Sequence, residues 1–193
     1  SIALLENAIS RYYNNKIAPV PIGSQHPSIV PFQFFKAKDS FLVVACGNNN
    51  LWKSLCETLD IMELVEDEMF ITNDKRVENH KILESLLTDI FGNKTVKEWC
   101  ELLQAAGIPC GPVYNVEEMV QDPHVMSREM ITKVMHPIIG EMSVPNFPLQ
   151  FSNTKINVEE PSPLLGQHTT EVLQGFLGKT YEELALLREE EVI

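Results

Sequence analysis

The chain has 193 residues, of which 44% are hydrophobic and 22% charged, an ordinary composition for a globular protein. Its formal net charge of -12 argues against a nucleic-acid surface, which needs clustered Lys and Arg. No apolar run approaches the ~20 residues of a membrane span, and the first residues, SIALLENAIS, lack the features of a signal peptide. We expect an intracellular protein in the cytoplasm, with the mitochondrial matrix as the alternative, and with no nucleic-acid or membrane partner.

The first third of the sequence predicts a helix, a linker, a hairpin and a second helix. Residues 2 to 13 have helical spacing and no starting Met, which suggests a piece of a longer chain. The prolines at 19, 21, 27 and 31 exclude a helix and predict an extended linker. FQFF and FLVVAC flank KAKDS as the strands of a hairpin, and GNNNLWKSLCETLD predicts a helix capped by Asn48 or Asn49.

The middle of the chain is rich in helix signals. TNDKRVENHKILESLLTDIFGN predicts one long helix that ends at Gly92. TVKEWCELLQAAG opens with a capping box from Thr95 to Glu98 and ends at Gly107. A short strand, IPCGPVYN, follows, and then two short helices capped by Asn115 and Asp122.

The last third predicts short strands in MITKVMHPIIGEMSVPNFPLQFS and then two helices. The final helix opens with a capping box from Thr180 to Glu183. The order of elements predicts an α+β fold in two lobes, with proline-rich seams at 19–31 and 137–163.

The four cysteines, at 46, 56, 100 and 110, form no C-x-x-C pair and have no histidine at metal-ligand spacing. We therefore expect reduced thiols and no metal site. Cys110 is either a nucleophile or a structural residue. It follows the C-terminus of a predicted helix, whose partial negative charge disfavours a thiolate. The structural interpretation is favoured, and a thiol enzyme remains the alternative.

Other candidates for chemistry lie in loops. His26, His136 and His168 are each a possible general base or ligand by pKa, or simply solvated or capping residues. The acidic runs VEDE and EEEV are typical of a solvated helix face. IGSQHPS and CGNNN are the two loops whose backbone N–H groups are best suited to a ligand, and a plain turn and a plain N-cap are the competing interpretations.

Six pieces of the sequence, taken in order, resemble one known family. They are HPSIVPFQFFKAKD, GNNNLWKSLC, TNDKRVENHKIL, EWCELLQAAGIPCGPVYNVEEMVQDPHV, HPIIGEMSVPNFPLQFS and PLLGQHTTEVL. Together they resemble the C-terminal half of the family III CoA-transferases, the group of formyl-CoA transferase, carnitine CoA-transferase and succinyl–hydroxymethylglutarate CoA-transferase. The resemblance covers nearly the whole chain.

The resemblance implies a division of the chain. Residues 1–22 would be the end of a large-domain helix and a linker, residues 23–120 a small domain, and residues 121–193 a return linker and the C-terminal segment of the large, Rossmann-like domain. It also implies an interlocked homodimer, coenzyme A or acyl-CoA as a substrate rather than a prosthetic group, and transfer of CoA to a small carboxylic acid through an aspartyl-CoA intermediate.

The residue that performs this chemistry is not found in the chain. The family's nucleophilic aspartate belongs to a segment upstream of Ser1, and no aspartate here lies in the matching motif, neither Asp39, Asp60, Asp67, Asp74, Asp89 nor Asp122. We therefore expect no catalytic residue in this chain and no activity from it alone.

Some members of the family carry a mobile glycine-rich loop over the active site. Its place corresponds to Gly23, Ser24, Gln25 and His26, where only one glycine is present. These four residues are the candidate lid. The alternative to a transferase is a non-catalytic binding or dimerisation module derived from the same fold.

Overall fold

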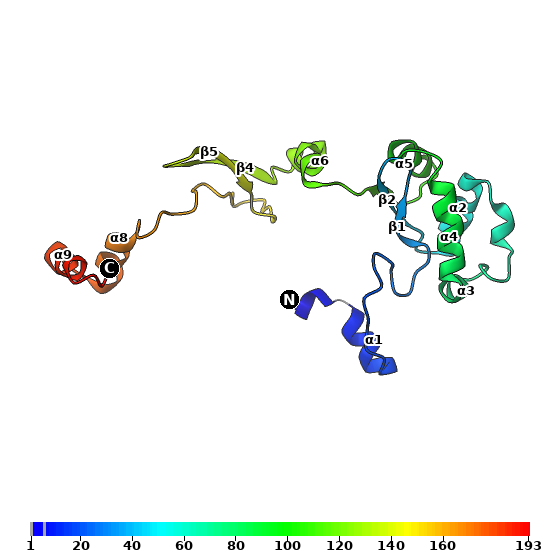
Figure 1. The fold of residues 1–193 in the computed structure, drawn as a ribbon, viewed down its shortest axis with the longest axis horizontal. Coiled ribbons are helices and arrows are strands. Elements are labelled where there is room, and N and C mark those ends of the chain that lie inside the picture. Colours follow the sequence, from blue (N-terminus) through cyan, green and yellow to red (C-terminus); the bar gives the residue numbers. More distant parts are fainter. Residues whose placement is uncertain (1, 6) are drawn as a thin grey trace. The chain divides into compact units, whose positions relative to one another are not determined.

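The computed structural model describes residues 2–5 and 7–193. The chain divides into two units, Ser1–Val113 and Tyr114–Ile193, and Figure 1 shows the elements of each. The division into residues 1–22, 23–120 and 121–193 stays a prediction, because it refers to a longer protein.

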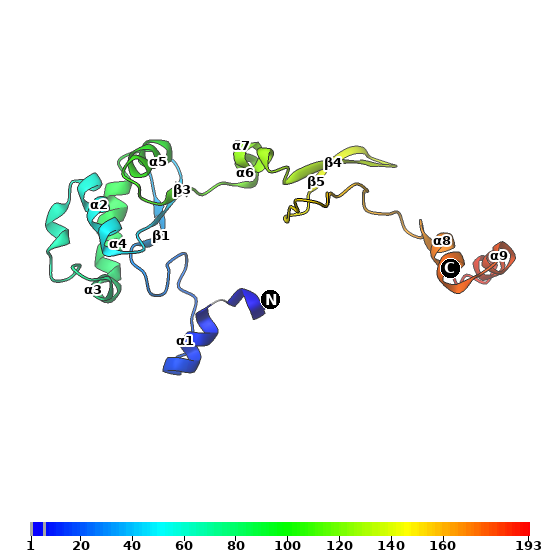
Figure 2. The ribbon, with the colours of Figure 1, turned by 180° about the vertical axis from the view of Figure 1, so that it is seen from behind.

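The first unit is built on a three-stranded antiparallel sheet. Its strands are β1 (Phe32–Lys36), β2 (Phe41–Ala45) and β3 (Cys110–Pro112), in the spatial order β1-β2-β3. The predicted hairpin is confirmed, with Phe34 opposite Val43. Strand β3 follows much later in the sequence and pairs with β2, which is therefore the central strand. Figure 2 shows β3 from behind.

Seven helical elements accompany this sheet in the described part of the first unit. They are the 3-10 helices η1 (Ile2–Leu5) and η2 (Met62–Val65), and the α-helices α1 (Asn7–Asn15), α2 (Asn49–Leu59), α3 (Asn73–Glu78), α4 (His80–Phe91) and α5 (Val96–Ala105). Helix α4 packs on β1, while α5 packs on β2 and β3. Figures 1 and 2 both show α4 alongside β1.

The core lies between these helices and one face of the sheet. Alternate strand residues point into it, as expected for a sheet with one covered face. The sheet contributes Phe35, Leu42 and Val44, and the helices contribute residues such as Leu83, Leu87, Phe91, Trp99 and Leu103, all buried. The ring of Phe91 packs against Phe35 with the planes tilted by 37°, and it meets Trp99 edge to face, an arrangement that aromatic pairs favour.

The predicted helix ends follow from local hydrogen bonds. Asn48 caps α2 by accepting a hydrogen bond from the backbone N–H of Leu51. Thr95 and Glu98 form the reciprocal capping box that opens α5. Gly107 follows that helix with φ of +73°, the left-handed conformation that commonly ends a helix.

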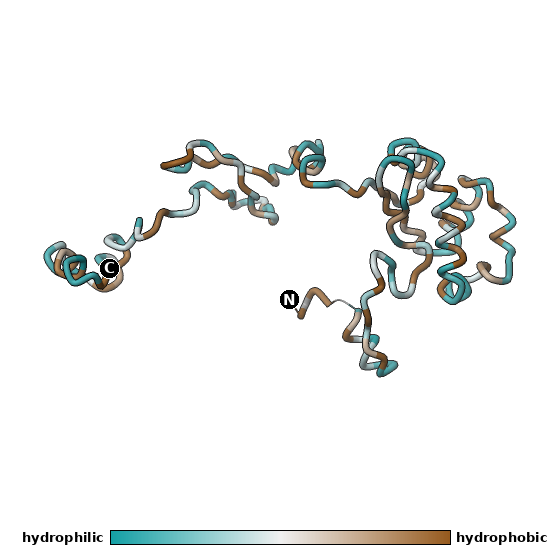
Figure 3. The backbone as a smooth tube through the Cα atoms, viewed as in Figure 1, coloured by the Kyte–Doolittle hydropathy of each residue, from teal (hydrophilic) through white to brown (hydrophobic). Residues whose placement is uncertain are grey.

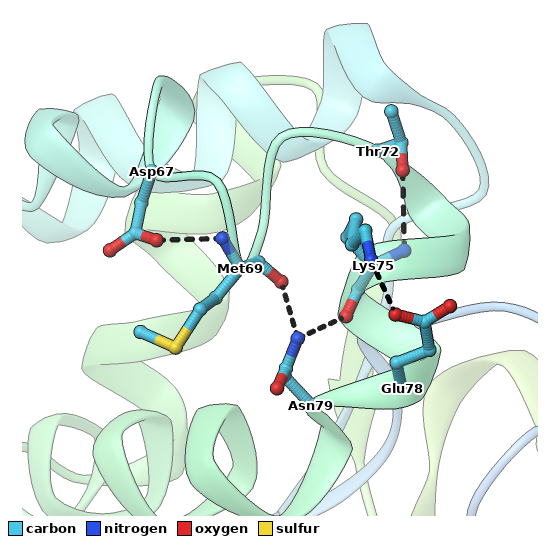
Figure 4. Close-up of polar contacts among 6 residues, drawn as sticks. All are labelled: Asp67, Met69, Thr72, Lys75, Glu78 and Asn79. Carbon is cyan, nitrogen blue, oxygen red and sulfur yellow. Dashed lines mark hydrogen bonds and ion pairs between the residues drawn. The ribbon is translucent and has the colours of Figure 1, made fainter.

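Two helix predictions need correction. The long helix expected from residue 72 to Gly92 is divided into α3 and α4 at Asn79, whose φ and ψ of -101° and 23° leave the helical region. The Asn79 side-chain amide donates to the carbonyl oxygens of Lys75 and Met69 (Figure 4), and such local bonds compete with a regular helix. The helix expected over residues 2–13 is η1 followed by α1, and residue 6 lies outside the described residues.

The second unit contains four short helices and a hairpin. They are α6 (Val116–Gln121), α7 (Pro123–Ser127), β4 (Ile131–His136), β5 (Gly140–Pro145), α8 (Thr169–Leu177) and α9 (Tyr181–Glu189). Asn115, Asp122 and Thr180 are the predicted caps, and all three accept hydrogen bonds from the helices they precede. The α+β class is confirmed in both units.

The second unit buries few large hydrophobic side chains. Among its described residues only Val134 and Leu184 belong to the buried apolar set. Hydrophobic residues are spread along the rest of this unit (Figure 3), and many are exposed, such as Ile138, Ile139 and Phe176. The described part of the second unit therefore has no counterpart to the core of the first. None of its helices, nor any in residues 2–5 and 7–113, combines the length and apolar character of a membrane span.

Candidate functional site

The candidate lid belongs to the loop 23–28, which lies along the free edge of β1. The backbone N–H of His26 donates to the carbonyl oxygen of Phe32 at 2.8 Å. The hydroxyl oxygen of Ser24 accepts from the backbone N–H of Phe34 at 3.2 Å. The loop therefore occupies backbone groups that an uncovered edge strand would leave without partners.

The side chain of His26 is held against the protein. Its ring stacks on the ring of Phe32, with centroids 5.2 Å apart and planes 6° from parallel. Its Nδ1 accepts a hydrogen bond from the backbone N–H of Ser28 at 3.2 Å. Gly23, at the start of the loop, has φ of +68°, which glycine adopts without the Cβ strain of other residues.

Gln25 lies between two shallow depressions of the first unit. One, of about 320 Å³, is lined by Gln25 and residues 77–82, where α3 meets α4. The other, of about 290 Å³, is lined by Gln25, Pro27 and parts of residues 11–22. The amide group of Gln25 and the polar side chains of the α3–α4 junction can offer hydrogen bonds to a polar ligand there, and Glu78 and Lys81 place one charge of each sign in the first depression.

A partly buried polar cluster of Gln33, His80 and Glu84 adjoins the first depression, which His80 also lines. Gln33, only 3% exposed, donates from its side-chain amide to a carboxylate oxygen of Glu84 at 2.7 Å, and its amide oxygen contacts Nε2 of His80. Nδ1 of His80 lies 3.8 Å from the other carboxylate oxygen of Glu84. Burial lowers the pKa of His80 below its usual 6.5, and the Glu84 carboxylate opposes this shift.

The second candidate loop, CGNNN, makes contacts within the protein. Asn48 is the N-cap of α2, so the plain N-cap interpretation is confirmed for this residue. The side-chain oxygen of Asn49 accepts a hydrogen bond from Nη2 of Arg76 at 2.9 Å. The side chains of Asn48 and Asn49 therefore have hydrogen-bond partners within the first unit.

Cys110 has the properties of a structural residue. It lies half-buried in β3, and burial raises the pKa of its thiol to about 11, with Cys100 adding to the shift. Its Sγ donates to the carbonyl oxygen of Cys100 at 3.9 Å. The thiol is protonated at neutral pH and is a poor nucleophile there. All four cysteines are free.

The other histidines named from the sequence serve local structure. Nδ1 of His136 accepts from the backbone N–H groups of Ile138 and Ile139 in the β4–β5 turn. His168 precedes α8 without capping it and faces Glu171 at 3.2 Å. Within residues 2–5 and 7–193, no three His, Cys, Asp or Glu side chains come together in a way that could hold a metal ion.

The sequence analysis missed Arg76, which bonds to Val30 just after the loop 23–28, and His80, which lines a depression together with Gln25. Both lie in the stretch interpreted as one amphipathic helix, where a polar residue reads as part of the solvated face. No signal in the sequence distinguishes these two residues from the exposed polar residues of the same stretch.

Comparison with known proteins places this fold. It is similar to the crystal structure of a CAIB/BAIF family protein from Brucella suis, with 28% sequence identity and a TM-score of 0.73, over 90% of this chain and 44% of that one. A second similar structure, Rv3272 from Mycobacterium tuberculosis, has 22% identity and a TM-score of 0.71 and supports the fold alone.

The chain belongs to the CoA-transferase family III, whose sequence profile matches residues 1–169. It is 34% identical over 185 residues to human succinyl-CoA:glutarate CoA-transferase, covering 96% of this chain and 42% of the relative. It is 30% identical over 161 residues to acetyl-CoA:oxalate CoA-transferase of Acetobacter aceti, covering 83% of this chain and 40% of that protein. The chain therefore spans less than half the length of these relatives, and the resemblance to the C-terminal half of this family is confirmed.

Proposed function

We propose that this chain is the C-terminal part of an enzyme that moves coenzyme A from an acyl-CoA donor to a small carboxylic acid. The observation that carries the proposal is family membership over residues 1–169, together with relatives whose names specify such transfers. The donors in these names are succinyl-CoA and acetyl-CoA, and the acceptors are glutarate and oxalate. Coenzyme A enters the reaction as a substrate, with no prosthetic group.

The proposed reaction uses an aspartate outside this chain. Its carboxylate attacks the thioester carbonyl carbon and displaces the CoA thiolate, giving a mixed anhydride. The thiolate then attacks the aspartyl carbonyl carbon, which releases the donor acid and leaves an aspartyl-CoA thioester. The acceptor carboxylate displaces CoA in the same way, and the thiolate finally attacks the acceptor's carbonyl carbon, restoring the aspartate.

Within this scheme the chain contributes a cover for the reacting groups. The candidate lid of Gly23, Ser24, Gln25 and His26 closes over the bound thioester and excludes water, which would otherwise hydrolyse the anhydride and the aspartyl-CoA. Its contacts to β1 are few: one backbone bond from His26, one bond to Ser24 and one ring stack. Contacts of this number can be exchanged for contacts with a substrate without unfolding the core.

The full-length protein is proposed to act as an interlocked homodimer in the cytoplasm, with the mitochondrial matrix as the alternative. Exposed hydrophobic residues of the second unit support the idea that this unit packs on another part of the assembly, because apolar side chains in such numbers are normally covered.

The test is a transfer assay on the full-length protein that carries this chain. Succinyl-CoA or acetyl-CoA is mixed with glutarate, oxalate and other small acids, and the new acyl-CoA is measured by mass spectrometry. We expect transfer to at least one acid, and none by residues 1–193 alone. Turnover by the isolated chain would overturn the external nucleophile. A full-length protein that dimerises and transfers CoA to no acid would favour the non-catalytic binding or dimerisation module.

A further inference from the structure

Arg76 is a fully buried cation without a carboxylate partner among the described residues. It lies in α3 with 0% exposure. Its Nε donates to the carbonyl oxygen of Val30 at 2.8 Å and its Nη1 to the carbonyl oxygen of Phe70 at 2.9 Å. Nη2 donates to the side chain of Asn49, and the guanidinium lies 5.1 Å from the centre of the Trp52 ring.

The neighbouring thiols do not neutralise this charge. Burial raises the pKa of both Cys46 and Cys56 to about 12, so both are uncharged at neutral pH. The positive charge of Arg76 is therefore balanced by carbonyl dipoles and by the ring of Trp52. Burying an ion in this way is costly, and an apolar residue would pack there at lower cost. The geometry of the guanidinium, which reaches three acceptors at once, explains its presence better than stability does.

Of the three groups that accept hydrogen bonds from Arg76, the carbonyl oxygen of Val30 is the most distant in sequence, and it is the one that connects Arg76 to the loop 23–28. Val30 lies two residues after the loop 23–28 and two residues before β1. Asn73 holds the same segment: its side-chain amide donates to the carbonyl oxygen of Ser28 at 2.8 Å, and its side-chain oxygen accepts from the backbone N–H of Val30 at 3.2 Å. Asn73 and Arg76 are three residues apart on α3, so they project from one side of the helix.

Helix α3 is itself well fixed. Thr72 caps it by accepting from the backbone N–H of Lys75, and Asn79 joins its last turn to the carbonyl oxygen of Met69 (Figure 4). A short helix of this kind, held at both ends, is a rigid support for the two side chains that reach the loop.

We propose that Asn73 and Arg76 are positioning residues that clamp the segment Ser28–Val30, so that residues 23–26 move as a lid about a fixed base. We call these two residues the loop clamp. This inference rests on the proposed function only in assigning the loop to the cover of a reacting thioester; the clamp itself is a property of the contacts described above.

The first experiment measures hydrogen exchange of single backbone amides in the full-length protein, by mass spectrometry with electron-transfer fragmentation. The variants are Asn73→Ala, Arg76→Lys and Arg76→Met. The amide of His26 is the readout, because its partner is Phe32 and neither clamp residue contacts it. We expect its exchange to rise at least tenfold in each variant.

The matched control is Leu103→Ala, a buried position on α5 that lowers core stability without touching the loop. We expect this variant to speed the exchange of core amides and to leave the exchange of the His26 amide unchanged. If Asn73→Ala and Arg76→Lys leave His26 within twofold of the parent protein, the loop clamp is refuted. Asn73 is only half-buried, so its variant decides the matter even if the Arg76 variants do not fold.

The second experiment measures a ratio that loss of folded protein cannot change. Acyl-CoA hydrolysis and CoA transfer are followed in the same reaction, and a displaced lid admits water to the intermediates. We expect the ratio of hydrolysis to transfer to rise about tenfold in the loop-clamp variants and to stay constant in Leu103→Ala. If exchange at His26 becomes faster but the ratio of hydrolysis to transfer does not change, the loop clamp is supported and its role in excluding water from the reaction is refuted. A parent protein without transfer would refute the proposed function, and the exchange data would still test the clamp.

Discussion

Replacing Gln33 by Met tests the polar cluster of Gln33, His80 and Glu84. The substitution keeps the length of the side chain but removes its hydrogen bonds to Glu84 and His80. A hydrogen bond to a carboxylate contributes about 1.5–3 kcal/mol to stability, and one between uncharged groups about 1 kcal/mol. The more apolar Met side chain offsets about 1 kcal/mol of this loss, so we expect the free energy of unfolding to fall by about 2 kcal/mol.

Urea unfolding followed by tryptophan fluorescence measures this change, because Trp52 and Trp99 both lie in the core of the first unit. With a dependence of about 2 kcal/mol per molar urea, the midpoint should fall by about 1 M. Gln104→Met, the same change on the exposed face of α5, should leave the midpoint within about 0.25 M. A Gln33→Met midpoint as little changed as that of the control would show that the cluster is not stabilising.

Three further predictions concern titration, reactivity and backbone strain. Burial lowers the pKa of His80 in the folded state, so the unfolded state binds more protons below about pH 6.5. The free energy of unfolding should therefore fall as the pH drops from 6.5 through the folded-state pKa. Urea titrations at several pH values should show that His80→Gln loses this part of the pH dependence. Burial raises the pKa of the Cys110 thiol to about 11, so this thiol should react with iodoacetamide at pH 7.5 at least about a hundredfold more slowly than a solvent-exposed cysteine in a short peptide. Labelling at the rate of the peptide would contradict the structural assignment of Cys110. Gly23→Ala should raise the exchange rate of the His26 amide about fivefold, because an alanine at positive φ costs roughly 1 kcal/mol of backbone strain. Gly111→Ala should leave this rate unchanged, because Gly111 has no positive φ and has open space for a Cβ. The same exchange rate of His26 in both variants would argue against strain at Gly23.

The residues at which several helices begin can be predicted from the sequence alone. Thr95, Asn115 and Thr180 each accept a hydrogen bond from a backbone N–H three residues further on. Interactions over so short a separation form in the same way wherever the helix is placed, and they can be read without knowing the fold. The hairpin of β1 and β2 was predictable for the same reason, because its two apolar runs are joined by a short turn.

Local patterns also set the limit of the prediction. Residues 72–92 carry a continuous apolar stripe at helical spacing. Nothing in this pattern indicates that the side chain of Asn79 donates a hydrogen bond to the carbonyl oxygen of Met69. A side chain chooses between the helix and a competing carbonyl group according to what the tertiary structure brings near it. The division into α3 and α4 therefore required the structure.

The surroundings of the candidate lid depend on contacts over long separations. Arg76 reaches Val30 across 46 residues, and Gln33 reaches Glu84 across 51. On the sequence alone Arg76 looks like a solvated residue of an amphipathic helix, because periodicity reports which face a residue lies on but not what covers that face. The packing of α4 on β1 and of α3 on α4, together with the bond from Arg76 to Val30, buries this guanidinium and brings its hydrogen bonds to the base of the loop, and neither the packing on β1 nor the bond to Val30 is local in sequence.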